Sequence, residues 1–294
     1  MNIPERLEKL REQMAAEGID VYVVPTADYH QSEYVGEHFK ERMYITGFTG
    51  SAGTAVITKT EARLWTDGRY FIQAAKQLEG STVELMKMGE PGVPTLNAWL
   101  EENLPEGGVL GFDGRTVSMG EGQAYAEIAD GKNGKVVYEF DLIDRIWEDR
   151  PALSEEPVFE LGVEYAGETA ESKLSRIREE MKKCGATAHV LTTLDDICWT
   201  LNIRGNDIEF FPLVLSYAVI TMDKMDLYIN EAKLSDEIKG HLADTGVVLH
   251  PYNDIYEDIK KTAADEVLLI DPGKLNYALY NNIPEGVKKV EERN

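Results

Sequence analysis

The amino-acid sequence predicts an α/β fold made of two tandem copies of one domain, each a mixed β-sheet flanked by helices. Short apolar runs of strand length alternate with amphipathic segments of helix length, which is the pattern of an α/β protein. The opening pattern restarts near residue 160, and 294 residues are enough for two domains of roughly 100–200 residues each. We therefore expect domains at residues 1–155 and 160–294, joined by a linker at Pro151–Glu160 that is rich in proline and glutamate.

The second half of the sequence repeats individual residues of the first half as well as its pattern of helices and strands. At one constant offset, a helical segment, a glycine and a short apolar strand recur. The matched pairs are Leu7 and Leu174, Leu10 and Ile177, Arg11 and Arg178, Glu12 and Glu179, Met14 and Met181, Gly18 and Gly185, Val23 and Val190, Thr26 and Thr193, and Asp28 and Asp195. Further on, after a gap, Ala55–Thr58 matches Ala218–Thr221. Two copies are too few for a solenoid, so each copy should form its own core.

The elements of the first half follow from periodicity and from helix-end signals. Apolar residues at helical spacing before Gly18 predict a helix that this glycine ends. Ser118 and Glu121 have the spacing of a capping box that opens a helix, and Pro151 ends the last one. The expected elements are a helix ending at Gly18, strands at 21–24, 54–57 and 62–65, a helix at 70–78, a strand at 83–86, a helix at 95–104, a strand at 109–112, and helices at 118–128 and 142–147.

The second half opens with the repeated helix and strand and continues with the same alternation. The expected elements are strands at 211–219, 225–228, 247–249 and 267–270 and helices at 235–242 and 255–262. A polar run without periodicity follows the last of these strands, at 287–294, and predicts that the sequence is one part of a longer protein.

Charge and composition exclude several classes of function. Thirty Lys and Arg residues against 53 Asp and Glu residues give a net charge of −23, and such a chain is repelled by nucleic acids and anionic membranes. No basic patch offsets this charge, since Lys288–Lys289 is followed by glutamates. No apolar run approaches the ~18–20 residues of a membrane span, and the first residues lack the apolar stretch of a secretory signal. We expect a cytoplasmic protein without nucleic-acid or membrane partners, with Cys184 and Cys198 as reduced thiols.

Gly47, Gly50 and Gly53 are the first candidate for chemistry, because glycine-rich loops bind phosphate through backbone N–H groups. The cluster lacks the Gly-Lys-Ser/Thr of a Walker loop and the Gly-x-Gly-x-x-Gly of a Rossmann fold. It also lacks the Gly-x-Ser-x-Gly of a nucleophile elbow, since Thr49 stands where that motif needs its first glycine. We interpret the cluster as a tight, close-packed turn leading into the strand at 54–57.

His30, Glu33, Glu37 and His38 form a local cluster of metal-ligand residue types. On a helix, His30 and Glu33 would share a face, as would Glu33 and Glu37, but the His-Glu-x-x-His order of a zinc helix is absent. We interpret the segment as a solvated polar loop and expect no functional metal site in the chain.

The remaining polar candidates have structural interpretations. His189 lies inside an apolar strand and is expected to be a core residue. The two cysteines are too far apart for a Cys-x-x-Cys pair, so a redox or zinc site is not expected. Asp195, Asp196 and Asp271 follow predicted strands, where active-site carboxylates often lie, but helix capping and turn formation explain them equally well.

Arg69 differs from these candidates, because it stands at the start of a predicted helix, where the helix dipole disfavours a cation. Asp67 and Gly68 make a tight turn after the strand at 62–65, and Thr66 or Asp67 can cap the helix. A cation in this place indicates an external carboxylate or a backbone carbonyl as its partner. The alternative, a structural pair between Asp67 and Arg69, stays open.

Eight stretches spread over most of the chain carry a resemblance to a known family. They are Val24–Tyr34, Gly47–Ile57, Trp65–Gln77, Leu85–Gly89, Asp144–Pro151, Leu194–Trp199, Asn202–Asp207 and Phe211–Ala218. These stretches resemble the N-terminal region of the cytosolic X-prolyl aminopeptidases (aminopeptidase P), which belong to the creatinase/prolidase or pita-bread metallopeptidases.

The resemblance implies two tandem creatinase N-like domains of ribonuclease H-like α/β type, which in the family precede a pita-bread catalytic domain. In that third domain two Asp, one His and two Glu bind a pair of divalent ions, typically manganese, and a bridging water attacks the bond before proline. The sequence lacks that domain's His-Gly-x-Gly-His segment, and Ile270–Gly273 is similar to its first metal-binding aspartate only superficially. We therefore expect no catalytic residue, metal or cofactor in this chain, and no activity from the chain alone.

The resemblance also implies a role within a larger enzyme. Such an enzyme removes the N-terminal residue from peptides with proline second, and these domains help to pair subunits and to narrow access to the active site. The expected partners are the protein's own C-terminal catalytic domain, a second subunit in a homodimer and short proline-containing peptides. The match of Trp65–Tyr70 implies that Arg69 reaches the catalytic cleft and orients the substrate.

Two other functions are compatible with parts of this pattern. The first is an acidic module that binds basic proteins, histones among them, as relatives of this architecture without metal sites do; the net charge of −23 is compatible with it. The second is hydrolysis of creatine or dipeptides, whose enzymes share the catalytic domain but usually have one N-terminal domain. The tandem repeat counts against this second alternative.

Overall fold

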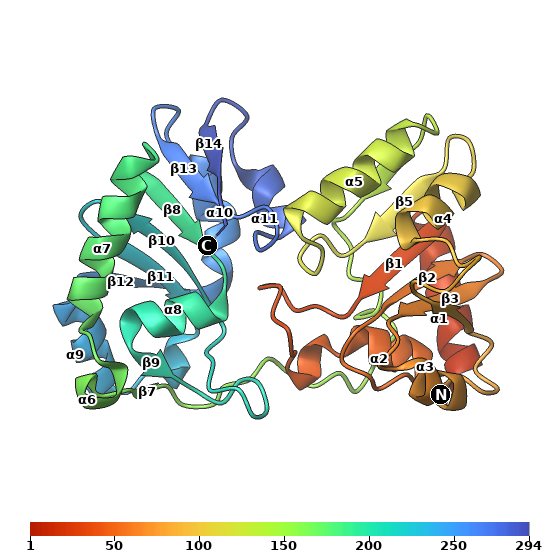
Figure 1. Ribbon diagram of the computed structural model, residues 1–294, viewed down its shortest axis with the longest axis horizontal. Helices are drawn as coiled ribbons and strands as arrows, with labels where there is room; N and C mark the ends of the chain where they lie inside the picture. Colours follow the sequence, from red (N-terminus) through yellow and green to blue (C-terminus); the bar gives the residue numbers. More distant parts are fainter. Residues whose placement is uncertain (294) are drawn as a thin grey trace. The chain divides into compact units, whose positions relative to one another are not determined.

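The computed structural model describes residues 1–293, and the chain divides into two compact units. The first unit comprises residues 1–29 and 33–152, and the second comprises residues 30–32 and the chain from residue 153 onward. Each unit contains its own six-stranded sheet with helices beside it, coloured from red to yellow-green in the first unit and mainly from green to blue in the second (Figure 1).

The sheet of the first unit has the strand order β4-β3-β2-β1-β5-β6. Strand β2 runs antiparallel to both β1 and β3, and the pairs β3–β4, β1–β5 and β5–β6 are parallel, so the sheet is mixed. Its elements are α1 Ile3–Ala16, β1 Val21–Pro25, the short 3-10 helix η1 Glu37–Phe39, α2 Glu41–Thr46, β2 Thr54–Thr58, β3 Ala62–Thr66, α3 Phe71–Gln77, β4 Glu84–Lys87, α4 Leu96–Asn103, β5 Val109–Phe112, α5 Met119–Asp130 and β6 Lys135–Val137.

The sheet of the second unit has the order β12-β11-β10-β8-β13-β14, and β7 and β9 form a separate two-stranded sheet. The elements are β7 Phe159–Glu160, α6 Val163–Ala166, α7 Ala170–Lys183, β8 Ala188–Leu191, α8 Leu194–Leu201, β9 Ile203–Arg204, β10 Ser216–Thr221, β11 Met225–Ile229, η2 Glu231–Lys233, α9 Asp236–Asp244, β12 Val247–His250, η3 Tyr252–Asp254, α10 Ile255–Asp258, η4 Ile259–Lys261, β13 Val267–Ile270, α11 Tyr277–Asn282 and β14 Lys288–Glu291.

The two six-stranded sheets have the same topology. Strands β8, β10, β11, β12, β13 and β14 take the places of β1, β2, β3, β4, β5 and β6, and each neighbouring pair keeps its direction. The two halves that repeat in sequence therefore also have the same fold. The prediction of two tandem α/β domains, each a mixed sheet flanked by helices, is confirmed.

The repeat extends to individual side-chain hydrogen bonds. The Nε atom of Arg11, on α1, donates to the carbonyl of Thr58 at 3.0 Å. Arg178, its counterpart on α7, donates to the carbonyl of Thr221 at 2.8 Å. In each unit an equivalent arginine thus joins the helix that precedes the first strand of the six-stranded sheet to the end of β2 or β10.

Helix α1 illustrates why these segments are helical. The side chain of Asn2 accepts from the backbone N–H of Glu5, and the side chain of Glu5 accepts from the backbone N–H of Asn2, both at 2.9 Å, so two free N–H groups are satisfied. Its buried face carries Leu7, Leu10 and Met14. Helices α1 and α7 have 14 residues each, and no helix within residues 1–293 is long and apolar enough to cross a membrane.

The helix expected at 142–147 is wrong, because residues 142–146 form turns. Side chains elsewhere in the first unit bond to backbone groups near both ends of this segment. The hydroxyl of Tyr22 accepts from the N–H of Leu142 at 3.1 Å, and the hydroxyl of Tyr44 donates to the carbonyl of Ile146 at 2.9 Å. Tertiary contacts therefore override the helical periodicity of this segment.

The strand expected at 211–219 begins only at Ser216. The backbone N–H of Phe211 donates to the carbonyl of Ile208 in a tight turn, and Pro212 has no N–H to offer a sheet. The N–H of Leu215 donates to the carboxylate of Asp207 at 2.6 Å. Because of these local bonds, the strand begins at Ser216 and not at Phe211.

Candidate functional site

The turn between β3 and α3 carries Arg69. The carboxylate of Asp67 accepts three hydrogen bonds from Arg69, from its backbone N–H at 3.0 Å and from Nε and Nη2 at 2.9 Å each. Helix α3 begins at Phe71 after Tyr70, whose side chain makes no capping hydrogen bond. The expectation that Thr66 or Asp67 caps this helix is wrong, because the hydroxyl of Thr66 donates to the carbonyl of Ala52 and Asp67 is engaged with Arg69.

The guanidinium of Arg69 is nevertheless open to solvent. The side chain is 67% exposed, and its central carbon lies 5.3 Å from the centre of the Tyr70 ring. The hydrogen bonds from Arg69 lower the pKa of Asp67, so the pair is fully charged at neutral pH. The structural pair that the sequence left open is thus present, and the cation remains accessible beside it.

The glycine cluster packs against this turn, as a close-packed turn should. A Cβ added to Gly50 would lie 2.2 Å from the Phe48 ring and 2.7 Å from the Tyr70 ring, so only glycine fits. The hydroxyls of Ser51 and Tyr70 are 2.6 Å apart. Arg42, which the sequence analysis did not single out, donates to the carbonyls of Phe48 and Gly50 and holds the loop from inside.

A groove of about 700 Å³ lies where this loop, the turn and two helices of the first unit meet. Polar side chains line it from β2, the turn after β3 and the helices α4 and α5, and apolar side chains line it mainly from β3 and these two helices. The lining residues are Ala52, Gly53, Thr54, Trp65, Thr66, Asp67, Met88, Thr95, Leu96, Asn97, Gly120, Glu121, Ala124 and Tyr125.

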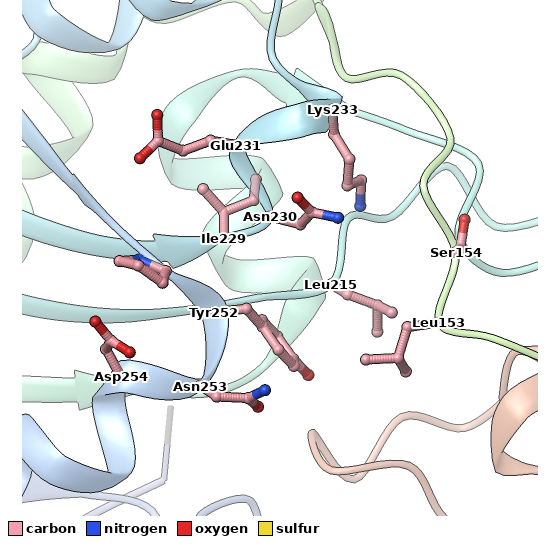
Figure 2. Close-up of a pocket in the computed structure, with 11 residues that line it drawn as sticks. Leu153, Ser154, Leu215, Ile229, Asn230, Glu231, Lys233, Tyr252, Asn253 and Asp254 are labelled. Carbon is pink, nitrogen blue, oxygen red and sulfur yellow. The ribbon is translucent and has the colours of Figure 1, made fainter.

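The second unit has a pocket of about 420 Å³ at the same end of its sheet (Figure 2). Leu215, Ile229 and Asn230 line it at the positions that Ala52, Thr66 and Asp67 occupy in the first unit, as the strand registers show. In Figure 2, Leu153, Leu215 and Tyr252 point toward the same hollow from the linker, the start of β10 and η3.

The turn after β11 repeats the turn after β3 with one difference. The side-chain oxygen of Asn230 accepts from the backbone N–H of Ala232 at 3.1 Å, just as Asp67 accepts from the N–H of Arg69. Ala232 stands in the place of Arg69 and has no guanidinium. The turn therefore forms with an acceptor side chain alone, and Arg69 is not needed to build it.

His30, Glu33, Glu37 and His38 are not gathered into a group of potential metal ligands within residues 1–293. His30 is 1% exposed and belongs to the second unit, where its ring nitrogens contact the carbonyl of Thr192 at 2.9 Å and the hydroxyl of Tyr252 at 2.6 Å. Glu37 pairs with Lys40, and His38 contacts the carbonyl of Pro151 at 2.7 Å. The expectation of a solvated loop is wrong for His30, because backbone and hydroxyl partners compensate for its burial.

A group that sequence reasoning missed lies inside the first unit. Glu41, Asp113 and Asp141 place one carboxylate oxygen each within 4.8 Å of one another, the one such group of three potential metal ligands within residues 1–293. Arg150 contacts Glu41 at 2.6 Å and Asp141 at 2.7 Å, and Arg115 contacts Asp113 at 2.8 Å. Because the three acids are far apart in sequence, spacing could not have revealed the group.

Charge in this group is unbalanced, since three carboxylates face two guanidiniums. Burial, together with the nearby charge of Asp141, raises the pKa of Glu41 well above its ordinary range. Burial also raises the pKa of Asp113. Each of the three acids already has an arginine partner, so the group acts as a buried ion-pair network whose two cations oppose the binding of a divalent ion.

The other candidates have structural roles. His189 is buried in β8, and its Nδ1 lies 3.0 Å from the carbonyl of Leu269. Burial raises the pKa of the Cys198 thiol to about 12, which makes it unreactive at neutral pH. Asp196, in the first turn of α8, accepts from the hydroxyl of the preceding Thr193, and Asp271 accepts from the N–H of Gly273 at 2.8 Å, so both carboxylates make local structural contacts.

Comparison with known proteins gives the same family over both units. Residues 6–145 match a profile of the creatinase/prolidase N-terminal domain, and residues 149–294 match a second profile with the same description. Aminopeptidase P2 of Arabidopsis thaliana is 40% identical over 283 residues, which cover 94% of this chain and 40% of the relative. A probable Xaa-Pro aminopeptidase P of Neurospora crassa is 43% identical over 266 residues, 88% of this chain and 38% of the relative.

A solved structure agrees with these sequence relatives. The X-prolyl aminopeptidase of Caenorhabditis elegans, described as a cytosolic enzyme with a di-nuclear active site, matches all of this chain with a TM-score of 0.94 and 34% identity. The match covers 50% of the worm protein, and this chain spans about two fifths of the length of the two curated relatives above. The chain belongs to the creatinase/prolidase N-terminal domain family, of which it contains two tandem copies.

Proposed function

We propose that this chain forms the non-catalytic N-terminal region of an X-Pro aminopeptidase, where it helps to pair subunits and limits the access of peptides to a catalytic domain. The names of the plant, fungal and worm relatives support the activity, and their greater length supports a further domain in the same polypeptide. The cytosolic worm enzyme supports a cytoplasmic location.

The two divalent ions of such an enzyme do not fit the described residues of this chain. The carboxylates that come closest to a ligand set, Glu41, Asp113 and Asp141, are already held by two arginines. We therefore assign the hydrolytic chemistry and the metal ions, which we expect to be manganese, to the catalytic domain. This chain then affects the substrate in two ways: its domains limit the access of peptides, and the charge of Arg69 contacts the peptide.

Arg69 is the residue to which we assign substrate contact in the assembled enzyme. The observation that carries this assignment is the repeated turn, which the second unit builds with Ala232 and without a guanidinium. A planar guanidinium open to solvent can hold a peptide carboxylate or carbonyl through two N–H groups. Asp67 fixes its direction from one side and leaves the other N–H groups available.

The test measures peptide cleavage and stability in parallel. In the natural polypeptide that contains this sequence, Arg69→Ala should lower kcat/KM for release of arginine from Arg-Pro-Pro by about tenfold or more, the loss expected for one charge-assisted hydrogen bond. In residues 1–294 the same change should leave the melting temperature nearly unchanged, because exposed ion pairs contribute about 0–1 kcal/mol. Lys59→Ala is the matched control, since Lys59 is 69% exposed in the same unit and pairs with Asp20.

A further variant separates substrate contact from bracing of the turn. Asp67→Asn copies the acceptor that the second unit uses, so the turn should persist while the guanidinium loses its ion pair. If Arg69 only braces the turn, Arg69→Ala will destabilise residues 1–294 and leave the kinetics per folded molecule unchanged. Absence of any cleavage by the natural polypeptide with manganese would contradict the aminopeptidase assignment and favour the acidic binding module instead.

A further inference from the structure

One segment of the first unit contacts β1, α1 and α2 and has no counterpart within the described part of the second unit. We call residues 138–150, which directly follow β6, the covering segment. Its side chains Leu142, Ile143 and Ile146 are buried in the same cluster as Leu10 of α1. The core of the first unit is therefore completed by chain that comes after the last strand of its sheet.

Two tyrosines hold the covering segment. The hydroxyl of Tyr22, on β1, donates to the carbonyl of Phe140 at 2.8 Å and accepts from the N–H of Leu142 at 3.1 Å. The ring of Tyr44, on α2, stacks on Trp147 with centroids 4.5 Å apart and an interplanar angle of 15°. These contacts are the reference against which we compare the same positions in the second unit.

The repeat identifies the counterparts of these positions in the second unit. At the constant offset of the repeat, Ile177 corresponds to Leu10 and His189 to Tyr22. Trp199 corresponds to Tyr44, because each stands three residues before the left-handed residue that ends its helix, Asn202 for α8 and Gly47 for α2.

A repeated cation contact confirms the pairing of Trp199 with Tyr44. Arg6 donates to the carbonyl of Tyr44 at 2.7 Å and lies 4.1 Å above its ring. Lys173, its counterpart on α7, donates to the carbonyl of Trp199 at 2.8 Å and lies 4.5 Å above its ring. In both helix pairs, α1–α2 and α7–α8, a cation of the first helix binds the carbonyl and the ring of one aromatic residue of the second. Tyr44 and Trp199 therefore occupy equivalent positions.

In the second unit these positions are open. Trp199 is 42% exposed, whereas Tyr44 is 7% exposed. Ile177 is half-buried, whereas Leu10 is fully buried. Within residues 1–293, the Nε2 atom of His189 bonds to no protein group and reaches solvent, whereas the equivalent hydroxyl of Tyr22 has two protein partners.

The protonation of His189 shows which partner Nε2 requires. Its Nδ1 contacts a carbonyl, which can only accept, so Nδ1 carries the proton. Burial lowers the pKa of His189, so the ring is neutral at physiological pH and Nε2 offers a lone pair. A protein group that replaces solvent at Nε2 must therefore donate a hydrogen bond, which is the role that the N–H of Leu142 has toward Tyr22.

The position of the covering segment in the chain indicates the occupant. In the first unit this segment directly follows β6, and the strand in the place of β6 is β14. The described residues end directly after β14, and the worm enzyme extends to about twice the length of this chain. We propose that the open α7–α8 face binds the polypeptide segment that directly follows β14, which packs apolar side chains on Ile177 and Trp199 and donates a backbone N–H to Nε2 of His189.

This inference rests on the proposed function, because it needs a polypeptide that continues beyond the described residues. It gives that function a physical connection, since the segment that completes the second unit's core is also the one that leads to the catalytic domain. The second unit and the start of the next domain would then unfold together. A change at Trp199 would weaken that connection while leaving the sheet of the second unit intact.

Cross-linking from position 199 tests the proposal directly. The photoreactive residue p-benzoylphenylalanine replaces Trp199 in the natural polypeptide, and mass spectrometry locates the cross-linked peptide. We expect it directly after β14. A cross-link to another region, a cross-link to a second copy, or no cross-link from correctly folded protein would overturn the proposal.

A pair of variants at His189 tests the hydrogen bond. In the natural polypeptide, His189→Phe removes the acceptor and should speed hydrogen exchange of the segment after β14 by about tenfold, whereas His189→Tyr restores the hydroxyl of the first unit and should not. Equal exchange in both variants would contradict the role of Nε2. In residues 1–294 alone, melting temperatures of the two variants show whether either change harms the second unit itself.

The peptidase assay distinguishes failure of this inference from failure of the proposed function. Cleavage of Arg-Pro-Pro without the cross-link would leave the function standing and overturn the docking surface. The cross-link without cleavage would support the docking surface and contradict the aminopeptidase function. Fluorine NMR of 5-fluorotryptophan gives an independent reading, since the Trp199 signal should become as protected from a soluble paramagnetic agent as that of buried Trp65.

Discussion

Glu41→Gln is the perturbation that reports most directly on the buried charge network of the first unit. Three carboxylates face two guanidiniums there, and burial raises the pKa of Glu41 well above its ordinary range. The unfolded chain releases the proton of this glutamate at a pKa of about 4.3, and the folded protein keeps it to higher pH. Glutamine is neutral at every pH and removes this linkage.

The sign of the effect follows from the raised pKa. A carboxyl group with a raised folded pKa contributes its full stability below the unfolded pKa and loses it as pH rises toward the folded pKa. The free energy of unfolding of the wild type should therefore fall relative to that of Glu41→Gln as pH rises from 5 toward 8. The limit is about 1.4 kcal/mol per pH unit, the value for one proton.

Urea unfolding at several pH values measures this difference. Trp199→Phe in both proteins leaves Trp65, Trp99 and Trp147, which all lie in the first unit, so fluorescence follows that unit alone. Glu148→Gln is the control, since Glu148 is exposed in the same unit and its pair with Lys9 spans 3.5 Å. A wild type that gains stability over Glu41→Gln as pH rises would show that Arg150 lowers the pKa of Glu41, and would refute the reasoning.

Three further predictions concern packing and reactivity. Tyr22→Phe should destabilise the first unit by about 1–3 kcal/mol in urea, because two backbone groups of the covering segment lose a buried partner; an unchanged midpoint would contradict this. Gly50→Ala should lower the melting temperature through overpacking of about 1–3 kcal/mol, since its Cβ would lie 2.2 Å from the Phe48 ring, whereas a neutral effect would mean that the loop adapts. Iodoacetamide at pH 8 should label the half-buried Cys184 well before Cys198, whose pKa is raised to about 12, and mass spectrometry would detect the opposite order.

Local patterns predicted most of the elements because helix ends and strand alternation are decided by near neighbours. The capping box of Ser118 and Glu121 and the left-handed glycine at position 18 both formed as expected. The segment at 142–147 forms turns instead, and two of its backbone groups bond to tyrosines more than a hundred residues earlier in the chain. Periodicity contains no information on such distant partners.

In the candidate site, too, local sequence predicted some features, and contacts between distant residues decided the others. The sequence singled out Arg69, but whether its turn needs the guanidinium was decided only when the strand registers placed Ala232 at the equivalent position. Extending the repeat past Thr221 in the sequence would have aligned the two turns. No comparable signal pointed to the group of Glu41, Asp113 and Asp141, which only folding brings together.

Two copies of one domain in a single chain act as controls for each other. Both units keep the strand order, the helix-to-strand arginine and the acceptor side chain of the turn, so these features serve the fold. They differ where the first unit has Arg69 and the second has Ala232, and where the first unit covers its aromatic ring and the second leaves Trp199 exposed. Folding alone does not require these differences, because each unit forms the same sheet without the feature of the other. We attribute these differences to the two contacts proposed above, with a substrate at the turn of the first unit and with a further segment of chain at the helices of the second.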